Sequence, residues 1–112
     1  MGGKASRNKG AAAELEVAKI INEALGTDIH RNLGQARDGE DDITLGKYRW
    51  EIKRRETLAI PSWCRQVEAC CKKGEVPIVC YRASRQPWRV VIPLDELLLL
   101  IKHAQKDIEF RY

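Results

Sequence analysis

The sequence predicts a single α/β domain, with a small β-sheet flanked by helices in the order α-β-β-α-β-β-α. Two stretches with helical periodicity each end at a glycine, the residue that most often terminates a helix. Four short runs rich in β-branched and aromatic residues predict strands. The length of 112 residues and the hydrophobic fraction of 44% suit one small core. Pattern and length therefore predict helices packed on one sheet.

The N-terminal half is expected to form an arm, a helix and a β-hairpin. The arm carries glycines and basic side chains without an acid, so we expect it to be flexible. The helix has apolar side chains at helical spacing and ends at Gly26, and the two strands meet at a Gly46-Lys47 turn. The predicted bounds are 1–10 for the arm, 11–25 for the helix, and 42–45 and 48–54 for the strands.

The C-terminal half is expected to add a helix, two strands and a last helix. Pro61 begins the first of these helices and Gly74 ends it. Pro93 breaks the last strand, and Asp95 and Glu96 then lie in the first turn of the final helix, where the macrodipole favours acids. The predicted bounds are 61–73, 76–82, 88–92 and a helix to about residue 103, followed by a short tail over 104–112.

The charge distribution points to a polyanionic partner. The net charge is +4 and the isoelectric point is about 9.0. Basic side chains concentrate in residues 1–10 and 47–55, whereas acids cluster in residues 38–42. A basic surface beside an acidic cluster suits a metal-dependent enzyme that acts on phosphodiesters. A small protein with ordinary solvated charges is the alternative at this point.

Cysteine usage and hydropathy indicate a cytoplasmic protein. No C-x-x-C pair occurs among Cys64, Cys70, Cys71 and Cys80, so a zinc site is not expected. Unpaired thiols are typical of a reducing compartment. The N-terminus lacks the apolar core of a signal peptide, and the longest apolar run, Leu97–Ile101, is too short to cross a bilayer. We therefore expect no membrane segment.

One carboxylate is predicted to lie on the apolar face of the first helix. At 100° per residue, apolar side chains surround Glu14, whereas Glu16 falls on the opposite side as an ordinary surface acid. A buried carboxylate needs an arginine, a proton or a metal ion as a partner, because an unpaired buried charge costs several kcal/mol. The alternative is that Glu14 reaches water from near the end of its helix. The apolar positions around it are Ala11, Leu15, Val17, Ala18, Ile21, Ala24 and Leu25.

A second acidic group is expected on the predicted hairpin. Alternation along residues 48–54 places Glu51 and Lys53 on one face of the strand. Asp42 begins the preceding strand, so the hairpin brings it toward Glu51. Two close carboxylates repel each other unless a divalent cation lies between them, and oxygen ligands suit Mg²⁺ or Mn²⁺. With Lys53 to stabilise transition-state charge and Glu14 in reach of the same ion, this set describes a phosphodiester hydrolase.

These residues also match a known superfamily in their order and spacing. The matching segments are Asn8-Lys9-Gly10, Glu14, Asp42-Ile43, Glu51-Ile52-Lys53, Gly74–Val79 and Trp88–Ile92. In them the chain resembles the PD-(D/E)-x-K nucleases, and within that superfamily the small archaeal-type and phage Holliday-junction resolvases. The resemblance covers roughly residues 7–98.

The resemblance implies a single nuclease domain over residues 1–112, with the restriction-endonuclease-like fold and its central mixed sheet. It implies a Mg²⁺-dependent homodimer, in a bacterial, archaeal or phage-infected cell, that resolves four-way DNA junctions by paired phosphodiester hydrolysis during recombination and repair. Carried over by position, Asp42 and Glu51 are metal ligands, Lys53 is catalytic, and Glu14 is the helix carboxylate of the site.

The sequence departs from the family pattern at three places. Asp41 stands where relatives carry proline, so either Asp41 or Asp42 is the ligand. The loop over residues 35–40 lacks the serine or threonine that assists catalysis in many relatives. Gln66 fits the first position of a Gln/Tyr pair on the helix after the strand, but Cys70 occupies the second. Gln66 is therefore an accessory candidate, and an exposed glutamine is the alternative.

Branched DNA and a second copy of the chain are the expected partners. Phosphate binding requires positive charge near the site, and recognition is expected through shape and backbone. The candidates for these contacts are Lys4, Arg7, Lys9, Arg31, Arg37, Arg54 and Arg55. The apolar run Leu97–Ile101 covers every side of a helix, which predicts a homodimer through this helix, unless the C-terminal tail folds over it.

Three functions stay open on the sequence alone. The first is the junction-resolving endonuclease. The second is a nuclease of the same fold that acts on another DNA structure or on a restriction-type site. The third is a DNA-binding module without catalysis, against which the joint presence of Glu14, Asp42, Glu51 and Lys53 argues.

Overall fold

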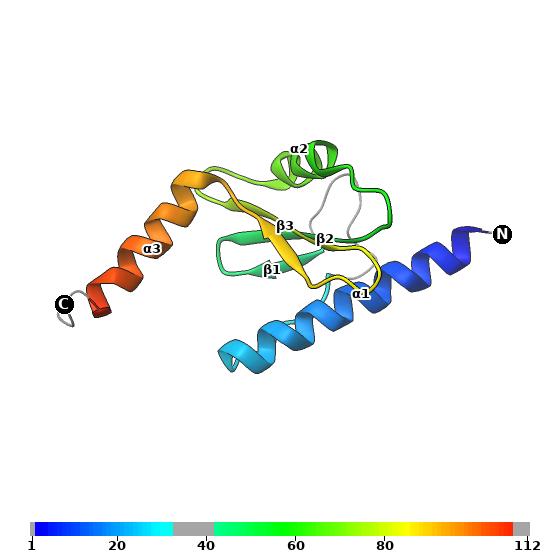
Figure 1. Cartoon of the computed structure of the whole chain (residues 1–112), viewed down its shortest axis with the longest axis horizontal. Coiled ribbons are helices and arrows are strands. Elements are labelled where there is room, and N and C mark those ends of the chain that lie inside the picture. The colour runs from blue at the N-terminus through cyan, green and yellow to red at the C-terminus, as the bar shows by residue number, and fades with distance from the viewer. Residues whose placement is uncertain (1, 33–41, 109–112) are drawn as a thin grey trace.

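A computed structural model describes residues 2–32 and 42–108 of the chain (Figure 1). Within these ranges, three helices and four strands follow the predicted order α-β-β-α-β-β-α. The elements are α1 (Gly2–Leu25), β1 (Ile43–Leu45), β2 (Tyr48–Arg54), α2 (Ile60–Cys70), β3 (Val76–Arg82), β4 (Arg89–Val91) and α3 (Leu94–Ile108).

The strands form one mixed sheet in the order β1-β2-β3-β4. β2 pairs in parallel with β3, and both outer pairs, β1 with β2 and β3 with β4, are antiparallel. The helix α2 is the crossover that a parallel pair requires. Gly46 occupies the β1–β2 turn with a φ of 58°, which favours glycine in this tight hairpin. The predicted α/β class with a mixed sheet is therefore confirmed.

Helices cover opposite faces of the sheet (Figure 1). On one face, Val17 and Ile21 of α1 belong to the same core cluster as Ile43 and Ile52 of the hairpin. On the other face, Trp63 and Val67 of α2 pack with Val79 of β3. The apolar cover on the α2 side thus lies over β3 and β4, and β2 presents polar side chains to that side. This division leaves the β1–β2 part of the α2 face available for chemistry.

The four strands lie within one residue of their predicted bounds, whereas the helices differ more. The first helix begins at Gly2, so the expected arm over residues 2–10 is helical. Ala, Lys and Arg in this segment are good helix formers, and Gly10 weakens the helix by only about 1 kcal/mol. The second helix ends at Cys70, because Cys71 adopts an extended conformation and donates its N–H to the Glu68 carbonyl at 3.1 Å.

Glu16 is not the ordinary surface acid that its position on the helix predicts. Its carboxylate accepts a hydrogen bond from Trp88 Nε1 at 2.8 Å and pairs with Arg82 Nη2 at 3.5 Å. The Arg82 guanidinium also lies 5.1 Å from the centre of the Trp88 ring. These contacts join α1 to the β3–β4 connection. Conversely, Leu15 and Leu25, predicted on the buried face, are exposed.

Cys64 and Cys80 are thiols outside any disulfide. Cys80 is buried under α1, and burial raises the pKa of its thiol to about 12. It therefore acts as a small apolar side chain. Within the described ranges, no helix has both the length and the apolar character needed to span a membrane.

Asn22 fixes the segment that follows α1. Its Nδ2 donates to the Ile29 carbonyl at 2.9 Å, and its Oδ1 accepts from the Ile29 N–H at 2.8 Å and from Thr27 Oγ1 at 2.7 Å. Gly26, with a φ of 69°, ends the helix by donating to the Asn22 carbonyl. One side chain thereby turns the backbone toward Arg31, which the site uses.

Replacing Asn22 with alanine is expected to lower the free energy of unfolding by about 1–3 kcal/mol, because partly buried backbone groups of Ile29 lose their partners. Urea unfolding followed by tryptophan fluorescence measures the change. The matched control is Glu23→Ala at the next, exposed position, with an expected change within about 0.5 kcal/mol. Equal stabilities for the two variants would contradict the role of Asn22.

Candidate active site

Strand β2 holds a buried ion pair on the side of the sheet that faces α2. Glu51 is 4% exposed, and its Oε2 lies 3.1 Å from Lys53 Nζ. Both side chains point away from the α1 core, because the alternate residues Trp50 and Ile52 pack on that core. The predicted shared face of Glu51 and Lys53 is therefore present. A lysine at this distance neutralises the buried carboxylate.

Asp42 continues the hairpin pairing one residue beyond β1. Its Oδ2 accepts a hydrogen bond from the Ile52 N–H at 2.7 Å, and its own N–H donates to the Trp50 carbonyl at 2.8 Å. The Asn32 N–H donates to the Asp42 carbonyl at 2.7 Å. The side chain thus takes the place of a main-chain acceptor. This arrangement locks the Asp42 carboxylate against the residue next to Glu51.

The electrostatic environment of Asp42 is strongly unfavourable to its charge. Burial, followed by the negative charges of Glu51 and Glu14, raises its pKa to about 7. The Ile52 N–H and the positive charge of Lys53 act in the opposite direction without overcoming these effects. Among the described residues, the fold therefore brings Asp42 close to two other carboxylates, Glu51 and Glu14, and their combined negative charge disfavours the ionised form of Asp42.

Glu14 forms an ion pair with an arginine, which was one of the three kinds of partner predicted for it. Arg31 Nη1 donates to Glu14 Oε1 at 3.0 Å, and the side chain of Glu14 is 16% exposed. The helix places Glu14 beside the buried Ala13, Val17 and Ala18, as a residue on the margin of the core face. Glu14 is therefore close enough to Asp42 to affect its pKa, while its own charge is balanced.

Comparison with protein families explains this constellation. The model of a family described as "Phage putative PDDEXK endonuclease" matches residues 5–111. The chain belongs to this phage endonuclease family. No curated protein and no solved structure matches the chain significantly. The predicted PD-(D/E)-x-K membership is confirmed, and nuclease activity follows at the level of the family.

Endonucleases of this superfamily generally depend on a divalent metal ion, and the donor chemistry of the site fits one. Asp42 and Glu51 offer only carboxylate oxygens, which Mg²⁺ and Mn²⁺ prefer. Among the described residues, no cluster of three or more His, Cys, Asp or Glu side chains is arranged to hold a metal. Mg²⁺ commonly uses one or two carboxylates with water, so Asp42 and Glu51 suffice. Glu14 would join them only after leaving Arg31.

The other predicted site residues of this chain lie in different places. Arg54 ends β2 directly after Lys53, and Arg55 follows the strand as an exposed residue. Gln66 is exposed on α2, in agreement with its simpler interpretation. Lys4, Arg7 and Lys9 are on the first turns of α1, but their side chains lie outside the described part, as do residues 33–41 with Arg37 and Asp41.

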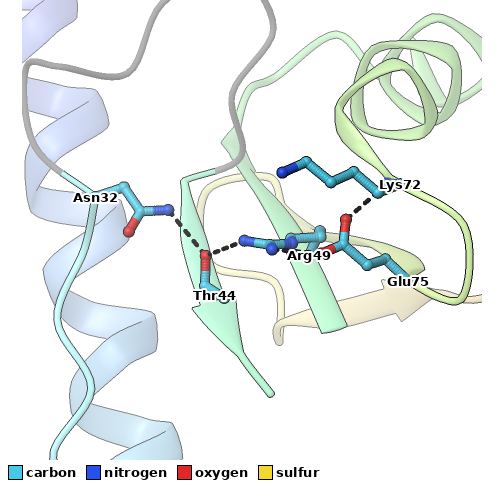
Figure 2. Close-up of polar contacts among 5 residues, drawn as sticks. All are labelled: Asn32, Thr44, Arg49, Lys72 and Glu75. Carbon is cyan, nitrogen blue, oxygen red and sulfur yellow. Dashed lines mark hydrogen bonds and ion pairs between the residues drawn. The ribbon is translucent and has the colours of Figure 1, made fainter. Parts of the chain in front are cut away.

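Sequence reasoning missed a polar network beside the carboxylates (Figure 2). Thr44 Oγ1 accepts from Arg49 Nη1 at 2.8 Å and from Asn32 Nδ2 at 3.2 Å. Arg49 also forms a short ion pair with Glu75, which lowers the pKa of that carboxyl, and Glu75 accepts from the Lys72 N–H. The signal available in the sequence was the position of Arg49 two residues before Glu51. The network ties the segment before residue 33 and the start of β3 to the hairpin.

The site generates a pH dependence of stability. The pKa of Asp42 is about 7 in the folded chain against 3.8 as the ordinary value, so the folded state binds the additional proton between these pH values. The contribution of Asp42 to stability is therefore present below about pH 4 and is lost as pH rises to 7. In metal-free buffer, Asp42→Asn should raise Tm at pH 8 by about 5 °C or more, and by little at pH 4.

Thermal unfolding by circular dichroism at both pH values, with EDTA present, measures this difference. Asparagine keeps the acceptor for the Ile52 N–H, so the comparison isolates the charge. Glu23→Gln, an exposed change on α1, should give the same small shift at both pH values. The Tm difference between Asp42→Asn and the unchanged chain could also be the same at both pH values. This result would contradict a pKa of Asp42 that is raised by burial and by the neighbouring carboxylates.

Proposed function

We propose that this chain is a Mg²⁺-dependent endodeoxyribonuclease that resolves four-way DNA junctions by paired hydrolysis of phosphodiesters. The hydrolase activity is proposed from one observation: the fold brings together Asp42, Glu51 and Lys53, with excess negative charge on buried carboxylates. The order of motifs along the chain, which resembles that of the small resolvases, supports the junction as substrate. Cleavage on two strands requires two active sites related by two-fold symmetry.

The chemistry assigned to each residue follows from its position. A divalent ion held by Asp42 and Glu51 would supply positive charge to phosphate oxygens and acidify a water molecule. An ion held there would favour the ionised form of Asp42, so Asp42 would release its proton on binding. With Glu51 bound to the ion, Lys53 would be able to donate a hydrogen bond to the developing charge on the phosphate. Burial of the pair makes this interaction stronger than it would be in water.

The DNA backbone is proposed to approach along the ends of the parallel strands. Arg54 and Arg55 follow Lys53 directly, so they lie where phosphates flanking the scissile bond would pass. Arg31 is proposed to exchange Glu14 for a phosphate, which would also free Glu14 for the site. Basic side chains early in α1 and in residues 33–41 complete the proposed contacts: Lys4, Arg7, Lys9 and Arg37.

The test is cleavage of a labelled four-way junction and of a linear duplex with the same arms, in Mg²⁺ and in EDTA. We expect paired cuts in the junction only, and only with Mg²⁺. Glu51→Gln and Lys53→Met are each expected to reduce the rate by about 100-fold or more, while junction binding in Ca²⁺ persists. Glu23→Gln and Lys73→Met are exposed, matched controls that should cleave normally.

The outcomes distinguish the three functions. Equal cleavage of the linear duplex would support hydrolase activity and refute the junction as the specific substrate, in favour of another DNA target. A junction that is bound but never cut, whichever metal is supplied, would refute catalysis and leave a DNA-binding module. Normal cleavage by Glu51→Gln would place the active site elsewhere.

A further inference from the structure

The helix α3 is an apolar element that the described part of the chain does not cover. It leaves the sheet after β4 and extends away from the other elements (Figure 1), with only sparse contacts to them. Its exposed apolar side chains are Leu94, Leu97, Leu98, Leu99, Leu100 and Ile101. A soluble domain rarely exposes so continuous an apolar surface without a partner.

The apolar side chains of α3 form one main stripe. At 100° per residue, Leu94, Leu97, Leu98 and Ile101 fall within an arc of about 100°. Leu99 lies on the far side of the helix from the centre of this arc, although its exposed fraction of 46% resembles the 43% of Ile101. The two residues therefore differ in direction and not in exposure.

The charges beside the stripe select the partner and its direction. Asp95 and Lys102 border the stripe on the same side, about 40–60° beyond its edge at 100° per residue. When two copies of one helix pack antiparallel, equivalent flanks meet, and Asp95 comes close to the partner's Lys102. Parallel packing would instead place each flank against the opposite, apolar flank of the partner. We propose that α3 pairs antiparallel with α3 of a second copy of this chain.

The stripe is self-complementary in this arrangement. Its four residues are symmetric about the point between Leu97 and Leu98, so Leu94 lies opposite the partner's Ile101. A two-fold axis through that point gives both chains the same surface, as in most homodimers. Antiparallel packing also sets the two helix macrodipoles in opposite directions, which is the favourable arrangement.

Apolar surface continues past the root of α3. A groove of about 160 Å³ opens there, between α2, the start of β3 and the residues that lead into α3. Its apolar lining includes Val67, Val79, Ile92 and Pro93, and Pro93 directly precedes Leu94. Four-residue helix stripes alone make a small interface, so this groove adds area toward the roughly 1,000 Å² of a stable one. The pairing rests on α3 and this groove alone and is independent of the proposed function.

Sedimentation velocity of the full chain tests the pairing without any nuclease assay. The unchanged chain should sediment with twice the mass of 12.8 kDa. Ile101→Asp should give a monomer, whereas Leu99→Asp, its matched control, should stay dimeric. Circular dichroism checks that both variants keep the fold, which is expected because α3 contributes little to the described core. A monomeric unchanged chain, or equal dissociation by both variants, would overturn the proposal.

Charge reversal tests the direction of packing. Asp95→Lys and Lys102→Asp should each raise the dimer Kd about fivefold, because symmetry repeats the contact twice. The double variant restores the pair with its charges exchanged and should return the Kd to near its original value. A double variant that is weaker than both single variants would overturn the antiparallel arrangement.

Discussion

The hydrogen bond from the Ile52 N–H to the Asp42 carboxylate is the constraint on which the site depends. It extends the β1–β2 pairing by means of a side chain, and so holds a carboxylate where the hairpin already carries Glu51. The main chain cannot release Asp42 without leaving the Ile52 N–H unpaired. Charge repulsion is therefore built into the sheet, and the raised pKa of Asp42 is its consequence.

The surrounding elements support this constraint instead of relieving it. Among the described residues, Lys53 pairs with Glu51 and Arg31 pairs with Glu14, and no ion pair in this part of the chain involves Asp42. Asn22 directs the segment that carries Arg31, and the Arg49 network anchors Asn32, whose N–H binds the Asp42 carbonyl. Stability is given up locally at a position where a divalent cation can restore it, as is common at functional sites.

Much of this architecture could be predicted from the sequence, because it depends on short-range patterns. Alternation placed Glu51 and Lys53 together, glycine and proline marked the turns, and the spacing of Asp42 to Glu51 predicted their approach. Contacts between distant segments could not be predicted in the same way. The pairing of Glu16 with Trp88, and of Arg49 with Glu75, joins residues that only the folded sheet brings together. The helical state of residues 2–10 was not predicted, because the glycines and basic side chains of this segment were interpreted as signs of flexibility although Ala, Lys and Arg favour helices.

The most direct test of the account is an NMR titration of the Asp42 side-chain carboxyl, first in EDTA and then in excess Mg²⁺. We expect a pKa of about 7 for Asp42 without metal, and a value below the ordinary 3.8 when Mg²⁺ is bound. Asp42→Asn identifies the resonance by its absence. A metal-free pKa near 3.8, or a raised pKa that Mg²⁺ leaves unchanged, would contradict the claim that crowded carboxylates on this hairpin form the metal site.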